Sequence, residues 1–163
     1  MRWVTRIATA AGMSAGLMVG ACQAEPPATS YTPPATAAPD DRGWETYEHA
    51  PVVDAAAAAS INPRADTPEA AVVKFLASRA RGDEEWKKAM VAEPSDRTKR
   101  QLAEWEEWTL ESFQLRARKS RGADTVSIKV FFAISFDGRS DEGEDEFEVA
   151  REGDGWRVAS PPA

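Results

Sequence analysis

The sequence has few of the side chains that catalytic and metal-binding sites most often use. It contains one cysteine, Cys22, one histidine, His49, and two tyrosines, Tyr31 and Tyr47, and all four lie in the first third of the chain. From Asp66 onward, acid–base chemistry would therefore fall to Asp and Glu. A single cysteine also excludes an internal disulfide, so the fold must be stabilised by its core.

Long apolar runs are missing as well. The longest, residues 7–19 (IATAAGMSAGLMV), is shorter than the roughly 20 residues that a membrane-spanning helix needs. Basic residues are outnumbered, because 20 Lys and Arg against 27 Asp and Glu give a net charge of −7, and removal of residues 1–21 would give 18 − 27 = −9. Such a chain lacks the excess of cations that nucleic-acid binding needs, so we expect no nucleic-acid partner.

The start of the chain has the pattern of an export signal. Two arginines precede the apolar residues 7–19, and two small residues stand directly before Cys22. Residues 19–22 (VGAC) resemble the lipobox of bacterial lipoproteins. The resemblance implies that residues 1–21 are a signal peptide and that lipid on Cys22 anchors the exported chain to a bacterial membrane, at the periplasmic face or outer cell surface. The alternative is a secreted protein with a spare thiol.

Residues 22–65 have the composition of a tether. Their seven prolines, mixed with Ala, Thr and Asp, favour extended conformations and cannot build a core, so we expect this segment to be mostly disordered. Two pieces stand out, Gly43–Tyr47 with its two aromatic residues and the alanine run Ala55–Ala59. Each is either a short local structure or part of the disorder.

Helical signals follow this tether. Thr67 is suited to cap a helix with Pro68 in its first position, Glu69 suits the helix dipole in the first turn, and Gly82 is placed to end the helix in a left-handed conformation. Further along, Asp83 is expected to cap a second helix that carries Trp86, Ala89 and Met90. Ser95 is expected to cap a third, which carries Leu102 and Trp105.

From residue 111 the apolar period changes to two. Residues 125–136 (TVSIKVFFAISF) place six apolar side chains on one face of a long central strand. The preceding strand is expected to pair Leu115 with Ile128. An acidic loop over 137–146 and two shorter strands, joined by a tight hairpin at Glu152–Gly155, complete a curved four-stranded antiparallel meander. Helices followed by such a meander predict an α+β domain over residues 66–160.

The order of these signals resembles the nuclear transport factor 2-like fold. The resemblance rests on residues 67–90 (TPEAAVVKFLASRARGDEEWKKAM), with Pro-Glu-Ala at a helix start and Gly-Asp at its end, and on strands that close in GDGWRV. Many bacterial lipoproteins, some called lumazine-binding-like, are similar. The resemblance implies a cone in which helices pack into a curved sheet, often with a pocket at the open end. That superfamily contains enzymes as well as binding modules, so function stays open.

Two groups of side chains invite a ligand. The first is aromatic and forms either the core or the wall of a pocket for a small apolar ligand: Phe75, Trp86, Trp105, Trp108, Phe132 and Trp156. The second is acidic and invites calcium: Asp137, Asp141, Glu142, Glu144, Asp145 and Glu146. Its spacing does not fit an EF-hand, so a solvated acidic hairpin is favoured, with no metal and no cofactor expected.

The far side of the central strand suggests a contact surface. Phe131 and Ala133 point away from the helices, and pairing brings Ala150 and Ala159 to the same side. A second copy, another envelope protein or the chain's own residues 44–47 would each cover this patch, unless Phe131 is merely exposed. We therefore expect a noncatalytic binding or interaction module with a weak interface. The alternative is a small-apolar-ligand carrier, or an isomerase- or dehydratase-like enzyme that uses the cone pocket.

Overall fold

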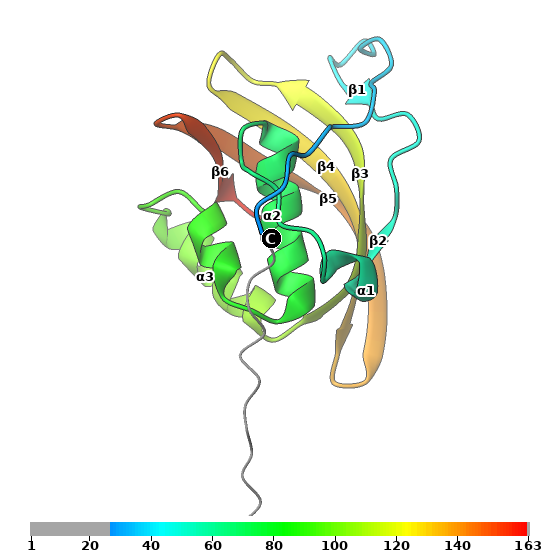
Figure 1. The fold of residues 1–163 in the computed structure, drawn as a ribbon, viewed down its shortest axis with the longest axis vertical. Helices are drawn as coiled ribbons and strands as arrows, with labels where there is room; N and C mark the ends of the chain where they lie inside the picture. Colours follow the sequence, from blue (N-terminus) through cyan, green and yellow to red (C-terminus); the bar gives the residue numbers. More distant parts are fainter. Residues whose placement is uncertain (1–26, 163) are drawn as a thin grey trace, which may run out of the picture.

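Residues 27–162 are described in the computed structural model, so Cys22 and the export signal lie outside the described part of the chain. The fold is α+β, with helices on one face of a curled, mainly antiparallel six-stranded sheet (Figure 1). The elements in chain order are β1 (Glu45–Thr46), β2 (Val53–Asp54), α1 (Ala55–Ala58), α2 (Pro68–Arg81), the 3₁₀ helix η1 (Glu85–Ala89), α3 (Asp96–Glu106), β3 (Thr109–Ser120), β4 (Thr125–Phe136), β5 (Arg139–Glu152) and β6 (Gly155–Ser160).

The first long helix begins and ends as the sequence predicts. The Thr67 side chain accepts a hydrogen bond from the Ala70 amide at 3.1 Å, and Gly82 has φ 71°, which favours glycine. Ser95 caps α3 by accepting a hydrogen bond from the Thr98 amide. Asp83 also accepts a hydrogen bond from a following amide, but the helix that follows is the short η1.

The meander β3–β4–β5–β6 forms the sheet, and α2 lies in its concavity with α3 and α1 on either side (Figure 1). We call the face toward α2 the inner face and the opposite one the outer face. The predicted partner of Leu115 is wrong, because Leu115 pairs with Val130. A bulge follows, so that Ala117 lies opposite Lys129 on the outer face and Arg118 lies opposite Ile128 on the inner face.

The acidic stretch after β4 is a strand. Only Asp137 and Gly138 form the turn, and their φ angles of 48° and 73° are those of a two-residue hairpin turn with both central residues left-handed. Strand β5 then starts at Arg139, so the loop expected over 137–146 is wrong. The next hairpin closes between Glu152 and Gly155, as predicted.

The described part of the expected tether is folded onto the domain. We call residues 27–65 the strap. Its start is paired with its end through the backbone of Thr29 and Asn62, and its two short strands extend the sheet at the edge of β3. Tyr47, Val53 and Ala58 are buried in the core. The expectation of disorder is therefore wrong for these residues, because the prolines lie between apolar residues that reach the core.

Within residues 27–162, no helix is both long and apolar enough to cross a bilayer.

Candidate functional site

The aromatic side chains of the predicted pocket mostly fill the interior. Phe75 is fully buried, and its ring centre lies 5.8 Å from that of Trp86 and 6.0 Å from that of Trp105. Trp105 is also packed 5.7 Å from Phe132 and 5.8 Å from Phe147, so one cluster joins α2, η1, α3 and the sheet. Edge-to-face and tilted contacts at these distances are those of a packed core. The rings thus fill the space in which the predicted pocket would hold a ligand.

Two of the six predicted pocket residues lie nearer the surface. Trp108 and Trp156 are half-buried. Trp108 and Trp86 line one side of a groove of about 660 Å³ at the C-terminal end of α2, but charged side chains such as Arg79 and Glu106 line the rest of it. The predicted set therefore does not form a single apolar pocket.

A buried carboxylate holds the strap against the domain. Glu69, in the first turn of α2, is only 1% exposed. Its Oε1 atom accepts hydrogen bonds at 2.8 Å from the Tyr47 hydroxyl of the strap and at 2.8 Å from Nη1 of Arg118 on β3. Burial raises the pKa of Tyr47 well above its ordinary value, and the adjacent Glu69 carboxylate raises it further. Tyr47 thus stays a neutral donor, and the three residues join strap, helix and sheet.

The sequence contained one signal of this contact. Glu69 precedes Val72, Val73 and Leu76 at helical spacing, so it lies on the buried face of α2 and not on the solvent side. Arg118 could not be predicted as its partner, because only the bulge in β3 turns that side chain inward. Tyr47 lies in the segment that we expected to be disordered.

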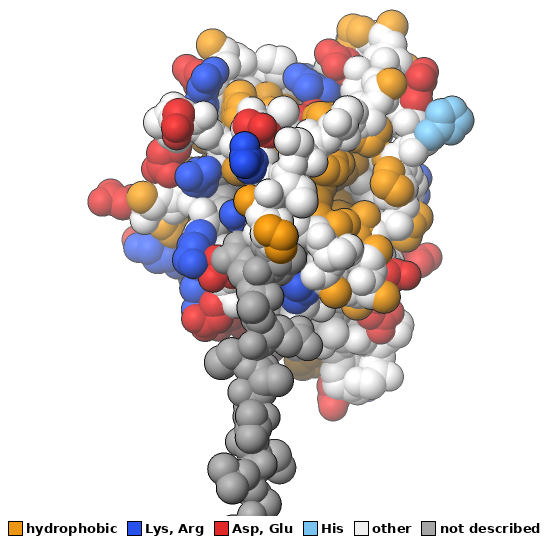
Figure 2. Space-filling view, viewed as in Figure 1, with side chains coloured by type: hydrophobic (Ala, Val, Ile, Leu, Met, Phe, Trp, Pro, Cys, Tyr) orange, Lys and Arg blue, Asp and Glu red, His pale blue; other side chains and the backbone are white. Residues whose placement is uncertain are grey.

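A small apolar cavity lies beneath the strap. It has a volume of about 80 Å³, and Tyr31, Val53 and Ile61 of the strap close it over Val73 and Phe113. Figure 2 shows apolar side chains gathered at this place, beside the first residues of the strap. Burial, with a smaller effect of Glu69, raises the pKa of Tyr31 to about 12. Small-molecule pockets usually measure about 300 to 1,000 Å³, so this cavity has room for only a few carbon atoms.

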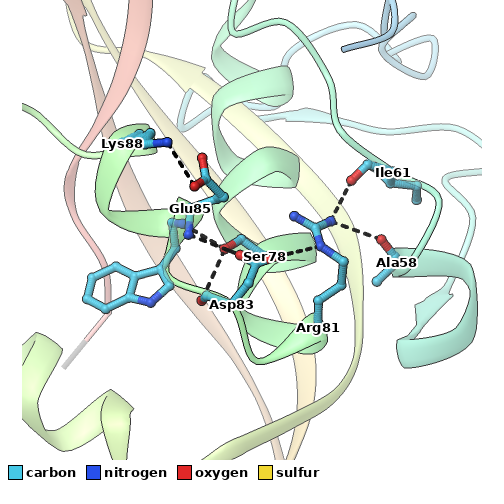
Figure 3. A network of polar contacts seen from close by, with 8 residues as sticks. Ala58, Ile61, Ser78, Arg81, Asp83, Glu85 and Lys88 are labelled. Atoms are coloured by element: carbon cyan, nitrogen blue, oxygen red, sulfur yellow. Dashed lines mark hydrogen bonds and ion pairs between the residues drawn. The ribbon is translucent and has the colours of Figure 1, made fainter. Parts of the chain in front are cut away.

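A second polar network fixes the end of the strap to the end of α2 (Figure 3). Arg81 donates hydrogen bonds from Nη1 to the carbonyl oxygens of Ala58 and Ile61, at 3.1 and 2.7 Å, and from Nε to Asp83 at 2.6 Å. Ser78 donates to Asp83 and accepts from the Trp86 amide. Burial alone would raise the pKa of Asp83, but the hydrogen bonds from Ser78 and Arg81 outweigh it and lower that pKa.

The outer face combines cations with aromatic rings. Trp44, just before β1, lies against the outer face, with Lys129 Nζ 4.8 Å from its ring centre and Lys119 and Arg121 within 6.0 Å. Arg116 covers the ring of Phe131 at 5.0 Å. A groove of about 330 Å³ lies here, lined by Trp44, by the cations Arg42, Arg116 and Lys129, and by the carboxylates of Asp40 and Glu144. Cations thus gather over β3 and β4 on this face of an otherwise acidic chain, next to the acidic residues of β5.

Comparisons with protein-family models, curated proteins and solved structures found no match for this chain.

None of the four predicted contact residues lines this outer groove, and Ala159 lines a different groove beside α3. Phe131, Ala133, Ala150 and Ala159 are all half-buried. Arg116 lies over Phe131, so the expected exposed phenylalanine is in part covered by the protein itself. The chain's own Trp44 also folds onto this face, where it contacts Lys129 and not Phe131. Sequence reasoning missed the arginines and lysines here, because their alternation in β3 and β4 resembles an ordinary solvated face.

Proposed function

We propose that this protein is exported, is anchored to a bacterial membrane by lipid on Cys22, and acts there as a noncatalytic module that binds another envelope protein. The export pattern and the VGAC sequence of residues 19–22 support the anchor. The packing of the interior supports the binding role most directly. Because Trp105 is packed against both Phe75 and Phe132 inside the cone, interactions fall to the surface.

We also propose the finer fold assignment, a nuclear transport factor 2-like cone. The support is the long helix α2 in the concavity of a curled antiparallel meander, capped at Thr67 and Gly82 as the resemblance implies. A cone of this kind normally has an open end. In this chain the strap crosses the concave side, and Tyr47 contacts Glu69 there.

The outer face is the surface that we assign to the partner. It carries a groove between Trp44, Arg116 and Lys129, and Phe131 lies beside it under Arg116. A partner that displaced Arg116 would bury one phenylalanine, which contributes about 1.5 to 3 kcal/mol. That is too little for a tight complex by itself, so we expect a weak interface to which the neighbouring charges contribute.

Photo-crosslinking in intact membranes tests the binding role. A photoreactive phenylalanine analogue at position 131 or 133 is expected to give a crosslink to one other envelope protein. The matched control carries the analogue at Val52, which is 64% exposed on the strap, and is expected to give none. Equal crosslinking from position 52, or none from 131 and 133, would contradict the proposal. A crosslink to a second copy would replace the envelope partner with a weak homodimer.

The anchor has its own test. Substitution of Cys22→Ser removes the thiol that would receive the lipid, so the protein is expected to move from the membrane fraction to the soluble fraction. Fractionation followed by immunoblotting measures this change. A Cys22→Ser variant that stays with the membrane as before would show that the anchor assignment is wrong.

The cavity beneath the strap favours one alternative, a carrier of a small apolar ligand. Its lining is almost entirely apolar, and movement of the strap would enlarge it. Titration with benzene followed by NMR distinguishes this alternative. Shifts confined to Val73 and Phe113 would support a carrier, and unchanged spectra would remove it.

A further inference from the structure

The groove on the outer face is built around a rigid turn. The Asp40 carboxylate accepts hydrogen bonds from the amides of Arg42 and Trp44, at 2.9 and 2.8 Å, and Gly43 has φ 78°. The hydrogen bond from the Trp44 amide is the main cause that lowers the pKa of Asp40. The turn therefore holds the Trp44 ring in place before any ligand arrives, which reduces the ordering cost of binding.

Two arginines of this groove lack carboxylate partners. Within residues 27–162, Lys129 pairs with Glu144 at 3.5 Å and Arg121 pairs with Glu146 at 2.9 Å. Arg42 and Arg116 both line the groove, which the carboxylates of Asp40 and Glu144 also line. Neither guanidinium is within ion-pair distance of a carboxylate among the described residues, although the charge of Arg42 acts on Asp40 and lowers its pKa. Both side chains are exposed. Each guanidinium thus has several N–H donors that are available to a ligand.

The chemistry of these N–H donors indicates which chemical group a ligand of the groove would carry. A guanidinium offers a planar fork of N–H groups that matches the two oxygens of a carboxylate. Two such forks in one groove fit a segment that carries more than one carboxylate. The 330 Å³ of the groove, with Trp44 on one side, accommodates side chains of a peptide.

The neighbouring strand limits how long such a ligand is. On the outer face of β5, acidic side chains lie opposite successive outer-face residues of β4: Glu142, Glu144, Glu146 and Glu148. This acidic row lies beside the cations of β3 and β4, and the whole chain is acidic. A long polyanion would be repelled there, whereas a short acidic segment that lies along β1 and β3 would not.

We propose that the groove between Trp44, Arg42 and Arg116 binds a short acidic peptide segment of the partner protein. This inference rests on the proposed binding function and specifies the partner's chemistry. The partner would place its carboxylates over β1 and β3 and neutral or basic residues over β5. The two charge rows of the outer face thus determine the orientation of the partner as well as its identity.

Peptide titration tests this inference. The protein is the chain from residue 22 with Cys22→Ser, so that no lipid is attached, and the probes are capped hexapeptides of Glu, Gln and Lys. We expect the Glu peptide alone to bind, with a shift of the Trp44 indole N–H signal in NMR spectra. Raising the salt from about 0.05 to 0.5 M is expected to weaken binding, because exposed charges are screened.

Paired variants supply the control. The double substitution Arg42→Gln/Arg116→Gln is expected to reduce the affinity for the Glu peptide about tenfold, or about threefold for each arginine. The matched double substitution Arg97→Gln/Arg100→Gln removes two exposed charges from α3 and is expected to change the affinity less than twofold. Thermal unfolding of all variants checks that the fold is retained.

Three results would overturn the inference: no binding of the Glu peptide, equal binding of the Gln peptide, or equal weakening by the α3 variant. Sedimentation adds a fourth, because a dimer lost in Arg42→Gln/Arg116→Gln would identify a second copy as the occupant. If the peptide fails while residue 131 still crosslinks to an envelope protein, the binding function stands and the acidic segment is wrong.

Discussion

Two arginines at one bulge have opposite roles in this molecule, one within the bulge and one just after it. Arg116 and Arg118 are two residues apart on β3, where a regular strand would turn both to the same face. The bulge between Leu115 and Ala117 instead leaves Arg116 exposed over Phe131 and turns Arg118 inward to Glu69. The inner arginine stabilises the fold by neutralising a buried carboxylate. The outer arginine is exposed, so the same residue type stabilises the fold on one face and lies at the proposed partner surface on the other.

The largest expected effect comes from breaking the inner contact. Substitution of Glu69→Ala removes the buried partner of both Tyr47 and Arg118 and leaves Arg118 with only the more distant carboxylate of Glu45, at 3.5 Å. We expect a loss of about 3 to 5 kcal/mol in the free energy of unfolding. Urea denaturation followed by circular dichroism measures this loss. A loss below about 1 kcal/mol would mean that Glu69 does not connect the strap to the domain.

Removing one hydroxyl group gives a smaller effect on the same contact. Tyr47→Phe keeps the buried ring but deletes the donor to Glu69, so we expect a loss of about 1 to 2 kcal/mol. Hydrogen exchange should then increase in the strap more than in β4, because the strap loses one of its hydrogen bonds to α2. Uniformly faster exchange throughout the domain would argue against this local role.

The network at the end of α2 predicts a dependence on pH. The pKa of Asp83 is lowered in the folded state, so its contribution to stability is present above the unfolded pKa and is lost as the pH falls through the folded one. Below about pH 4, the parent should therefore lose stability more steeply than Asp83→Asn. At pH 7 we expect Asp83→Asn to cost about 1 kcal/mol or less. Thermal unfolding from pH 2 to 7 compares them, and parallel curves would exclude Asp83 as a contributor.

The smallest expected effect on stability comes from the outer arginine. Arg116→Gln removes an exposed charge above Phe131, and we expect a change of at most about 0.5 kcal/mol in the free energy of unfolding. The same urea titration that is used for Glu69→Ala gives a direct comparison. A loss as large as that of Glu69→Ala would remove the distinction between the two faces.

Local signals in the sequence predicted the elements that depend on local chemistry. Thr67, Gly82 and Ser95 act through hydrogen bonds and backbone angles within a few residues, and each ends or begins a helix as expected. The alternation over residues 125–136 likewise predicted β4 with its correct bounds. These features need no knowledge of distant contacts.

Most features that the sequence did not predict depend on contacts between distant residues. The exception is one local signal, the turn at Asp137-Gly138. The bulge at residue 116 changes the face of Arg118 without any marker in the sequence, and its benefit appears only through Glu69, 49 residues earlier. The prolines of the strap predict an extended, disordered chain, but Tyr47 and Val53 are buried on the domain. Asp137-Gly138, by contrast, is a strong hairpin signal that the acidic composition around it concealed.

If lipid on Cys22 anchors the protein as proposed, the folded strap shortens the reach of the domain from the membrane. A flexible tether from Cys22 to residue 65 would span 43 residues, or at most about 150 Å of extended chain. Thr29 is already hydrogen-bonded to Asn62 and Arg64. A lipid on Cys22 would therefore be separated from the folded strap by a linker of seven residues, which reaches at most about 25 Å. The domain would then sample a thin layer above the bilayer, where its effective concentration toward other membrane-bound proteins is high. Under that confinement, a weak interface would be sufficient for the proposed binding to another membrane-bound protein.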